Sequence, residues 1–416
     1  MNKSVLISAF SSVAAALVAA AAPSVGDVAL VQDAETRRVT VSYTLAGEPA
    51  IVTLDIQTNG VSIGSAHVTG VFGDVNAVVQ PTGESETRRI WWQPDVSWAF
   101  NRVTDGSLKA VVTAWPTNDP PDYIVYDLAV PGAREFYVSA DQIPGGVSAK
   151  VYKTEKLVMR RIPAAGVRWR MGSPKGETGR GNNKNEVPHF VTLSRDYYMA
   201  IYPFTQGQYK TLTGSSQNSY SASKIDALER PCEGNSNKNW TINYNNVRGG
   251  DWPTEDVAAD TVIDKLRVRT GQDTFDLPTE ARWEFACRAG TSGALNSGKL
   301  NTSENYDRLG FRNATGIEGD STVQPVGRLE PNAWGLYDMH GNIIEFCLDW
   351  YQEDLSTLPE LDPVGPATNA DNMRAVRGGG MGGGWHNCRS ASRSSVIVGQ
   401  GSLQTGFRVV CETIVK

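Results

Sequence analysis

The stretch PNAWGLYDMHGNIIEFCLDWY, residues 331–351, decides the fold of this chain. It places three Trp or Phe rings, one proline, two glycines and five Asn, Asp or Glu side chains in one short run. Neither helical nor strand periodicity persists through it, yet it is too apolar for a solvent-exposed loop. Such a segment folds only when tertiary contacts bury its rings and satisfy its irregular backbone. We therefore expect it to pack inside an irregular domain.

A turn within this stretch offers oxygen ligands for a hard cation. Asn342 and Glu345 lie three residues apart in a Gly-Asn turn, and calcium prefers carbonyl and carboxylate oxygens. The turn lacks the full loop signature of a calcium site. The alternative is that Asn342 caps a turn and that Glu345 is the buried partner of an arginine. Spacing alone leaves both interpretations open.

The composition favours two globular domains. The chain has 416 residues, of which 40% are hydrophobic and 20% charged, so two domains with cores are possible. Its 41 glycines and 21 prolines indicate a β-rich or irregular architecture rather than helix bundles. Acidic and basic residues are interspersed at a net charge of -6, without a Lys/Arg stripe, so we expect no nucleic-acid partner.

Residues 1–22 have the pattern of a secretory signal peptide. Lys3 supplies the positive charge, an apolar run broken only by serines follows, and small residues up to Ala22 offer cleavage sites before Pro23. The alternative is a membrane anchor, but the run is short, rich in alanine and lacks a basic stop-transfer flank. We therefore expect a secreted, periplasmic or cell-surface protein with no membrane span after signal cleavage.

Export would place the five cysteines in an oxidising compartment, where they could pair. They are Cys232, Cys287, Cys347, Cys388 and Cys411. Because five is an odd number, at least one thiol stays unpaired or pairs with another chain, and spacing does not define the connectivity.

Residues 27–142 alternate like the strands of an immunoglobulin- or fibronectin-like β-sandwich. Short β-branched runs recur about every ten residues between Gly, Asp, Asn and Pro turns, with no helical segment. The string GVSIG at 60–64 matches the nucleophile elbow of hydrolases, but a strand rather than a helix follows the serine, so we interpret it as a turn. We assign this domain a spacer or docking role and expect a linker at 143–155.

Residues 156–412 have a different texture, with few strand signals and more Gly, Asn and Trp. Thr205 and Gln208 form a capping-box pair that predicts a short helix. Residues 260–270 predict an amphipathic helix that ends at a glycine. Thr279 predicts the N-cap of a second helix.

Seven segments of this region carry its most specific patterns: WRMGS (169–173), EVPHFVTL (186–193), LPTEARWEFACRAGT (277–291), the stretch at 331–351, VRGGG (376–380), NCRSASR (387–393) and TGFRVV (405–410). Together and in this order, they resemble the sulfatase-modifying-factor family, which has the formylglycine-generating-enzyme fold. The resemblance implies an α+β, C-type-lectin-like fold with little regular secondary structure, here preceded by the all-β sandwich. Fold membership alone does not establish chemistry.

The resemblance also implies calcium as a cofactor. In the family one calcium lies at the GN-x-x-E turn, which corresponds here to Asn342, the backbone of Ile343, and Glu345. A second calcium would fall near Asn305 and Glu318. These five residues are the candidate metal ligands.

The catalytic pattern of the family is incomplete. Its characterised oxidases convert a substrate cysteine to formylglycine with oxygen and a copper ion held by two cysteines, since soft thiolates suit copper(I). The corresponding window, GGGMGGGWHNCRSASR (378–393), contains one cysteine, Cys388. We therefore expect no copper and no catalytic residue, Cys388 being the one candidate, although Met381 and His386 offer an alternative soft site. The iron-dependent branch needs a cluster of histidines from a helical domain, whereas this chain has four histidines and a preceding β domain.

The same window predicts a ligand-binding face. Met381, Trp385, His386, Ser394 and Gln400 lie on its glycine-rich, turn-rich scaffold. In some exported relatives this C-terminal strip binds ligands, and in retroelement-diversified receptors it is hypervariable. A Trp-His pair with small neighbours predicts a contact patch, because Trp supplies area at low entropic cost. The alternative is that Trp385 is buried in the core.

Two further groups of residues have structural interpretations. Asp338, Glu345 and Asp349 could form the paired carboxylates of a glycoside hydrolase, but the packed motif already accounts for them. Arg389 and Arg393 are expected to be structural ion-pair partners rather than anion binders.

The resemblance also favours a disulfide between Cys347 and Cys388, which occur together in many relatives. For the whole chain, we predict an exported recognition protein that binds a protein or glycan ligand at Trp385 and His386. The alternative is a formylglycine-generating oxidase that modifies a sulfatase cysteine with an atypical site.

Overall fold

The computed structural model describes residues 21–83, 86–104, 106–180, 184–216, 221–234, 242–254, 256–298, 302, 322–381 and 384–413. The predicted signal peptide, apart from Ala21 and Ala22, lies outside the described residues, as do the candidate calcium ligands Asn305 and Glu318. In the described part of the chain, no helix combines the length and hydropathy that crossing a membrane requires.

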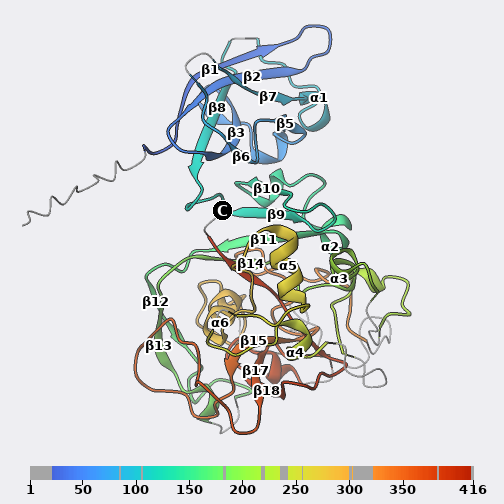
Figure 1. The fold of residues 1–416 in the computed structure, drawn as a ribbon. Coiled ribbons are helices and arrows are strands. Elements are labelled where there is room, and N and C mark those ends of the chain that lie inside the picture. The colour runs from blue at the N-terminus through green and yellow to red at the C-terminus, as the bar shows by residue number, and fades with distance from the viewer. Residues whose placement is uncertain are drawn as a thin grey trace, which may run out of the picture.

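The N-terminal strands form two sheets around one core (Figure 1). One sheet has the order β1-β2-β7-β5, and the other contains β4-β3-β6 with β8 paired to β3. Val39, Val41, Tyr43 and Leu45 alternate along β2 and point into the core. Apolar residues of β3, β7 and β8 complete the same cluster, so the expected all-β sandwich is confirmed. The bounds are β1 Ser24–Gln32, β2 Val39–Ala46, β3 Ala50–Thr58, β4 Val61–Ser62, η1 Ser65–His67, β5 Val71–Gly73, β6 Val78–Val79, β7 Arg88–Trp92, α1 Pro94–Ser97 and β8 Lys109–Pro116.

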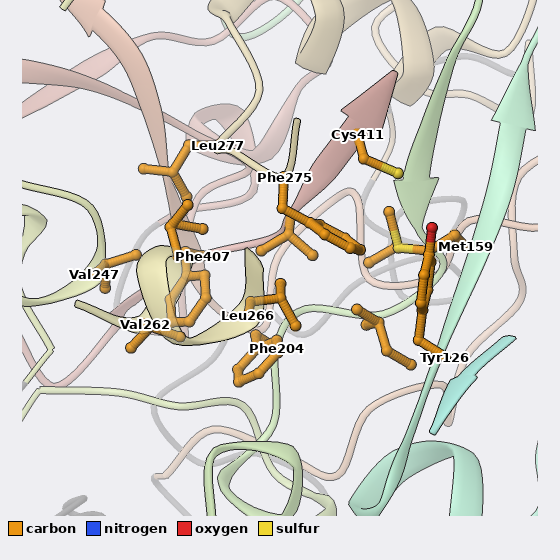
Figure 2. Packing of buried hydrophobic residues seen from close by; sticks show 14 of the residues in the cluster. Tyr126, Met159, Phe204, Val247, Val262, Leu266, Phe275, Leu277, Phe407 and Cys411 are labelled. Carbon is orange, nitrogen blue, oxygen red and sulfur yellow. The ribbon is translucent and has the colours of Figure 1, made fainter. Parts of the chain in front are cut away.

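A five-stranded antiparallel sheet, in the order β10-β9-β11-β14-β20, organises the second unit. Neighbouring residues of β11 enter different apolar clusters: Leu157 and Met159 pack on one face, and Val158 on the other. Figure 2 shows the first cluster, in which the rings of Tyr126 and Phe275 meet edge to face. The bounds are β9 Tyr123–Asp127, β10 Arg134–Tyr137, η2 Ala140–Gln142, α2 Val151–Thr154, β11 Lys156–Ile162, β14 Tyr197–Ala200 and β20 Val410–Glu412.

The boundary between the units lies earlier in the chain than the sequence pattern suggested. Strands β9 and β10 fall within the predicted sandwich at 27–142, yet β9 pairs with β11 of the second unit. The predicted linker at 143–155 is also packed, because Ile143 and Tyr152 are buried in the second apolar cluster. Periodicity identifies a strand but does not say which sheet it joins.

Two small sheets and several helices complete the second unit. The sheets have the orders β12-β13-β16 and β18-β17-β15-β19. Thr205 and Gln208 form the predicted capping box of α3, Thr261 caps α5, and Thr279 caps α6 as predicted. The bounds are β12 Val167–Met171, η3 Lys184–Glu186, β13 His189–Leu193, α3 Gln206–Thr213, η4 Ala227–Glu229, α4 Tyr244–Val247, α5 Val262–Thr270, α6 Glu280–Arg288, β15 Ile344–Trp350, β16 Glu360–Leu361, β17 Met373–Arg377, η7 Trp385–Cys388, β18 Ser394–Ile397 and β19 Thr405–Gly406.

The stretch at 331–351 is buried along most of its length, as expected. Its first part is irregular, with Asp338 and Asn342 in the left-handed backbone region at φ 59° and 67°. Its second part is β15, whose five inner residues are all buried. A strand covered on both faces shows no alternation, which explains why the sequence pattern did not reveal it.

The predicted disulfide between Cys347 and Cys388 does not form, and none of the five buried cysteines is paired with another. Cys347 packs in the second apolar cluster with Ala281, whereas Cys388 packs with Leu295 in a separate one. In this chain the two cysteines occupy separate buried apolar positions.

Candidate functional site

The glycine-rich window follows β17 and forms the wall of a small cavity of about 170 Å³. Gly379 has a φ of 70°, and a Cβ placed on it would lie 2.5 Å from the Cys388 sulfur. A Cβ on Gly380 would lie 2.8 Å from Oε1 of Gln404. Glycine is therefore required at 379, whereas at 380 a side chain would have to displace Gln404. The cavity is lined by Ile344, Val376, Arg377, Gly378, Gly379, Gly380, Asn387, Ser392, Arg393, Ser394 and Gln404.

Buried ion pairs anchor this window to α6. Arg377 donates to Glu284, and Arg393 makes two hydrogen bonds to Glu280, of 2.8 and 2.5 Å. Although burial opposes it, the neighbouring carboxylates Glu284 and Glu280 raise the pKa of Arg377 above its usual range. Each guanidinium is thus held charged within the protein.

Arg389 anchors the other end of the window. Its guanidinium bonds both oxygens of Glu186, at 2.8 and 2.7 Å, and one oxygen of Glu177 at 2.6 Å. The prediction that Arg389 and Arg393 are structural ion-pair partners is therefore confirmed. Their partners lie more than a hundred residues away in the chain, so no local signal could identify them.

The five predicted ligand contacts do not form one surface. Met381 is buried against Val323 and Ile343, so its side chain does not reach a ligand at the surface. Ser394 is exposed at the small cavity, and Gln400 is exposed in the turn after β18.

The structure brings Trp385 and His386 together in η7. Their rings meet edge to face with centroids 5.8 Å apart, and His386 is exposed. Trp385 is half-buried: one part packs against Leu295 and Cys388, and the rest remains accessible. It therefore combines the two interpretations that the sequence left open, a core contact and a surface contact.

Cys388 has the environment of a structural thiol. It is fully buried, and its carbonyl accepts a hydrogen bond from Nδ1 of His340 at 2.8 Å. That bond leaves Nε2 of His340 to accept from the backbone N–H of Asn296 at 3.0 Å. Burial lowers the pKa of His340 to about 4, so the ring is neutral near pH 7.

A second buried thiol lies beside the same imidazole. Cys287 is 3.9 Å from Nε2 of His340, and burial raises its pKa to about 12. A thiol protonated at neutral pH and closed off from solvent is a poor nucleophile and a poor metal ligand. The Cys287–His340 pair is therefore a packing arrangement.

The predicted calcium ligands have protein partners instead. Both oxygens of Glu345 bond Arg408, at 3.0 to 3.2 Å, and one also accepts from the indole of Trp283 at 2.7 Å. The Asn342 amide bonds the backbone of Gln324 in both directions, at 2.8 and 3.0 Å. A carboxylate neutralised by a buried arginine does not fit a calcium site. The alternative interpretation, a buried arginine partner, describes this turn.

The three candidate hydrolase carboxylates do not share one cavity, although Asp338 lies within electrostatic reach of Glu345. Asp338 is buried, and burial raises its pKa to about 6. Asp349 lines a larger cavity, of about 550 Å³, together with Glu280 and His189. Within the described residues, no three His, Cys, Asp or Glu side chains are grouped to hold a metal ion. The sequence did not reveal this cavity, because its walls come from segments far apart in the chain.

Comparisons with known proteins agree with the resemblance. The domain description "Sulfatase-modifying factor enzyme 1-like domain" matches residues 165–413. A formylglycine-generating enzyme of Thermomonospora curvata is 32% identical over 152 residues, covering 33% of this chain and 50% of that protein. "Chaperone protein LppX" of Paenibacillus barcinonensis is 27% identical over 214 residues, covering 46% of this chain and 70% of that protein. Among solved structures, Treponema denticola variable protein 1 is 24% identical with a TM-score of 0.46, covering 62% of this chain and 95% of that one. The chain spans about half the length of the formylglycine-generating enzyme that it matches.

Proposed function

The chain belongs to the family of sulfatase-modifying factor enzyme 1-like domains, and from this premise we propose that it is an exported recognition protein. In this proposal, Trp385 and His386 contact a protein or glycan ligand, with Ser394 at the adjoining small cavity. The proposal places no calcium at the turn of Asn342 and Glu345, because Arg408 already neutralises Glu345.

The observation that carries the proposal is the state of Cys388. A copper(I) site of the family's kind needs two thiolates, and Cys388 is the one sulfur donor of that type between 378 and 393. Its thiol packs on the backbone of Gly379 and against Leu295, fully out of solvent. A ligand site in this window therefore works through its surface side chains rather than through bound metal.

The Trp385–His386 pair has the properties of a contact patch. Trp385 is anchored on one side, so it loses little side-chain entropy when a ligand covers its accessible part. His386 stands beside it, and the neighbouring Gly384 offers no side chain that would block access. Aromatic residues with this combination of anchoring and exposure dominate binding energies at interfaces.

Site-specific photo-crosslinking tests the proposed face. A benzophenone side chain at position 386 of the full chain should capture a ligand from the extracellular fraction or from a glycan array, and Trp385→Ala should abolish that capture. The matched control places the same group at Phe100, which is also exposed, on the sandwich. Capture at both positions, or capture that survives Trp385→Ala, contradicts the proposed face.

The oxidase alternative predicts a different outcome. Copper-treated protein under air, given a peptide with a sulfatase-type cysteine, should leave the thiol unchanged if the chain is a recognition protein. Conversion of the peptide to its aldehyde, detected by mass spectrometry, would establish the oxidase and overturn the proposal.

A further inference from the structure

The cavity of about 550 Å³ is lined by residues of six segments, among them Met171 of β12 and Arg393 at the end of the glycine-rich window. Glu280 at the start of α6 and Asp349 near the end of β15 line it. His189 at the start of β13 and the segment 352–366 complete its walls. Its volume is in the range of small-ligand sites. Neither the family resemblance nor the proposed recognition face uses it.

The lining carries an excess of negative charge. Five carboxylates face two basic side chains, Arg393 and His189. Arg393 is bonded through two nitrogens to both oxygens of Glu280, so this pair is neutral. The remaining carboxylates are Asp349, Asp354, Glu360 and Asp362, and His189 lies 3.7 Å from Glu360. His189 and the buried Arg374, which interacts with Asp349, balance at most two of these four groups, so the cavity favours a cation.

Asp349 offers one carboxylate oxygen to a ligand. It is 4% exposed, and its Oδ2 accepts from the backbone N–H of Glu280 at 2.8 Å. The backbone N–H of Asp349 also interacts with its own carboxylate, and an ionised carboxylate has further lone pairs for a ligand. Gly365 lies against it, where a Cβ would come within 3.2 Å of Oδ1. Glycine at 365 thus lets this segment pack against Asp349 without a side chain that would cover Oδ1.

The arrangement of the cavity carboxylates favours an ammonium over a guanidinium group. A guanidinium binds best to two free oxygens of one carboxylate, whereas an ammonium is a compact charge that one oxygen satisfies. In the described chain the cavity carboxylates are not grouped as metal ligands. Trp350, Leu355 and Val364 add apolar wall, against which an aliphatic stem packs.

We propose that this cavity binds the side chain of a lysine presented by a partner protein, with its ammonium on Oδ1 of Asp349 and its methylene stem along the apolar wall. Asp354 at the exposed mouth and Glu360 add to the attraction from a distance. This site is independent of the Trp385–His386 face, so either can fail without the other.

Binding rises with pH, because Asp349 must be ionised to hold a cation. Burial, and then the neighbouring Glu280, raise the pKa of Asp349 to about 7, while Arg393 opposes the shift. Lysine affinity should therefore increase about tenfold between about pH 6 and about pH 8. The charged or titratable groups that influence Asp349 or line the cavity with it are Glu280, Arg393, Arg374, Tyr244, Cys347, His189, Asp354, Glu360 and Asp362.

Calorimetric titration of the full chain with Nα-acetyl-lysine methylamide tests the proposal. The neutral isostere Nα-acetyl-norleucine methylamide should not bind. Asp349→Asn should weaken the lysine probe about thirtyfold, the effect of removing one member of a buried charge pair. Asn retains an oxygen for the Glu280 N–H, so the fold persists.

Two further variants distinguish binding in the cavity from a general effect of net charge. Asp354→Asn, at the exposed mouth, should weaken the lysine probe about threefold. Asp371→Asn changes the net charge equally at an exposed position outside the cavity and should change nothing. Equal binding of the norleucine probe, full affinity in Asp349→Asn, or equal losses in Asp371→Asn and Asp349→Asn would each overturn the proposal.

Discussion

Replacing Glu345 by Gln distinguishes a buried ion pair from a calcium site at the centre of the fold. Glu345 and Arg408 are both fully buried, and the guanidinium bonds both carboxylate oxygens. In the variant, Arg408 keeps its bonds to the carbonyls of Ala200, Ile201 and Tyr337 but loses its counter-charge. The amide oxygen of the new side chain cannot serve both Arg408 and Trp283 as the carboxylate does.

The expected cost is large because a charge remains buried without its partner. Breaking a buried pair from one side costs about 3–5 kcal/mol. For a unit of this size, that cost lowers the midpoint of thermal unfolding by about 10 °C. The added variant Arg408→Met should recover part of the loss, because it removes the unpaired charge.

Differential scanning calorimetry of the second unit's transition measures the effect, with and without a calcium chelator. The matched control is Glu353→Gln at an exposed position, which should leave the midpoint unchanged. The chelator should also have no effect on the wild-type protein. The reasoning is refuted if Glu345→Gln costs less than about 1 kcal/mol, within the range of surface substitutions, or if the chelator lowers the wild-type midpoint as far as the substitution does.

Three other outcomes follow from the described contacts. Burial raises the pKa of Asp349 to about 7, so the native state binds its proton more tightly than the unfolded state does, and stability should fall as pH rises from about 4 to about 7. Asp349→Asn should remove that loss of stability, which is on the order of a few kcal/mol. Denaturant titrations at several pH values measure the effect, and an unchanged pH dependence in the variant would contradict this prediction. Gly379→Ala should cost at least about 2 kcal/mol more than Gly271→Ala, measured by urea unfolding, because both glycines have φ 70° but only Gly379 meets the Cys388 sulfur. Peptide mapping under non-reducing conditions should find Cys347 and Cys388 as thiols, and a linked peptide would refute the described packing.

The helices illustrate what local signals reveal. The α5 and α6 helices begin at capping threonines and end in left-handed residues, and each cap depends on contacts within about one turn. The alternation of β2 likewise identified a strand with one buried face. These elements were therefore predictable without a tertiary structure.

Strand β9 shows that a local pattern does not predict which strand it pairs with. Its alternation indicates a strand, but its pairing with β11 joins residues 29 to 37 positions apart. A strand bonds any edge with a compatible register, so the sandwich and the second sheet were equally consistent with the pattern. The domain boundary consequently shifted once the pairing was known.

The sequence by itself determined the family, the sandwich, the capped helices and the lone cysteine of the glycine-rich window, because each is a property of residue types at short spacing. Tertiary structure alone decided that Glu345 meets Arg408, that Met381 faces inward, and that Asp349 opens onto an acidic cavity. Ion pairs and cavities are formed by residues from distant segments of the chain. Their distances, and hence their electrostatic energies, exist only in the folded chain.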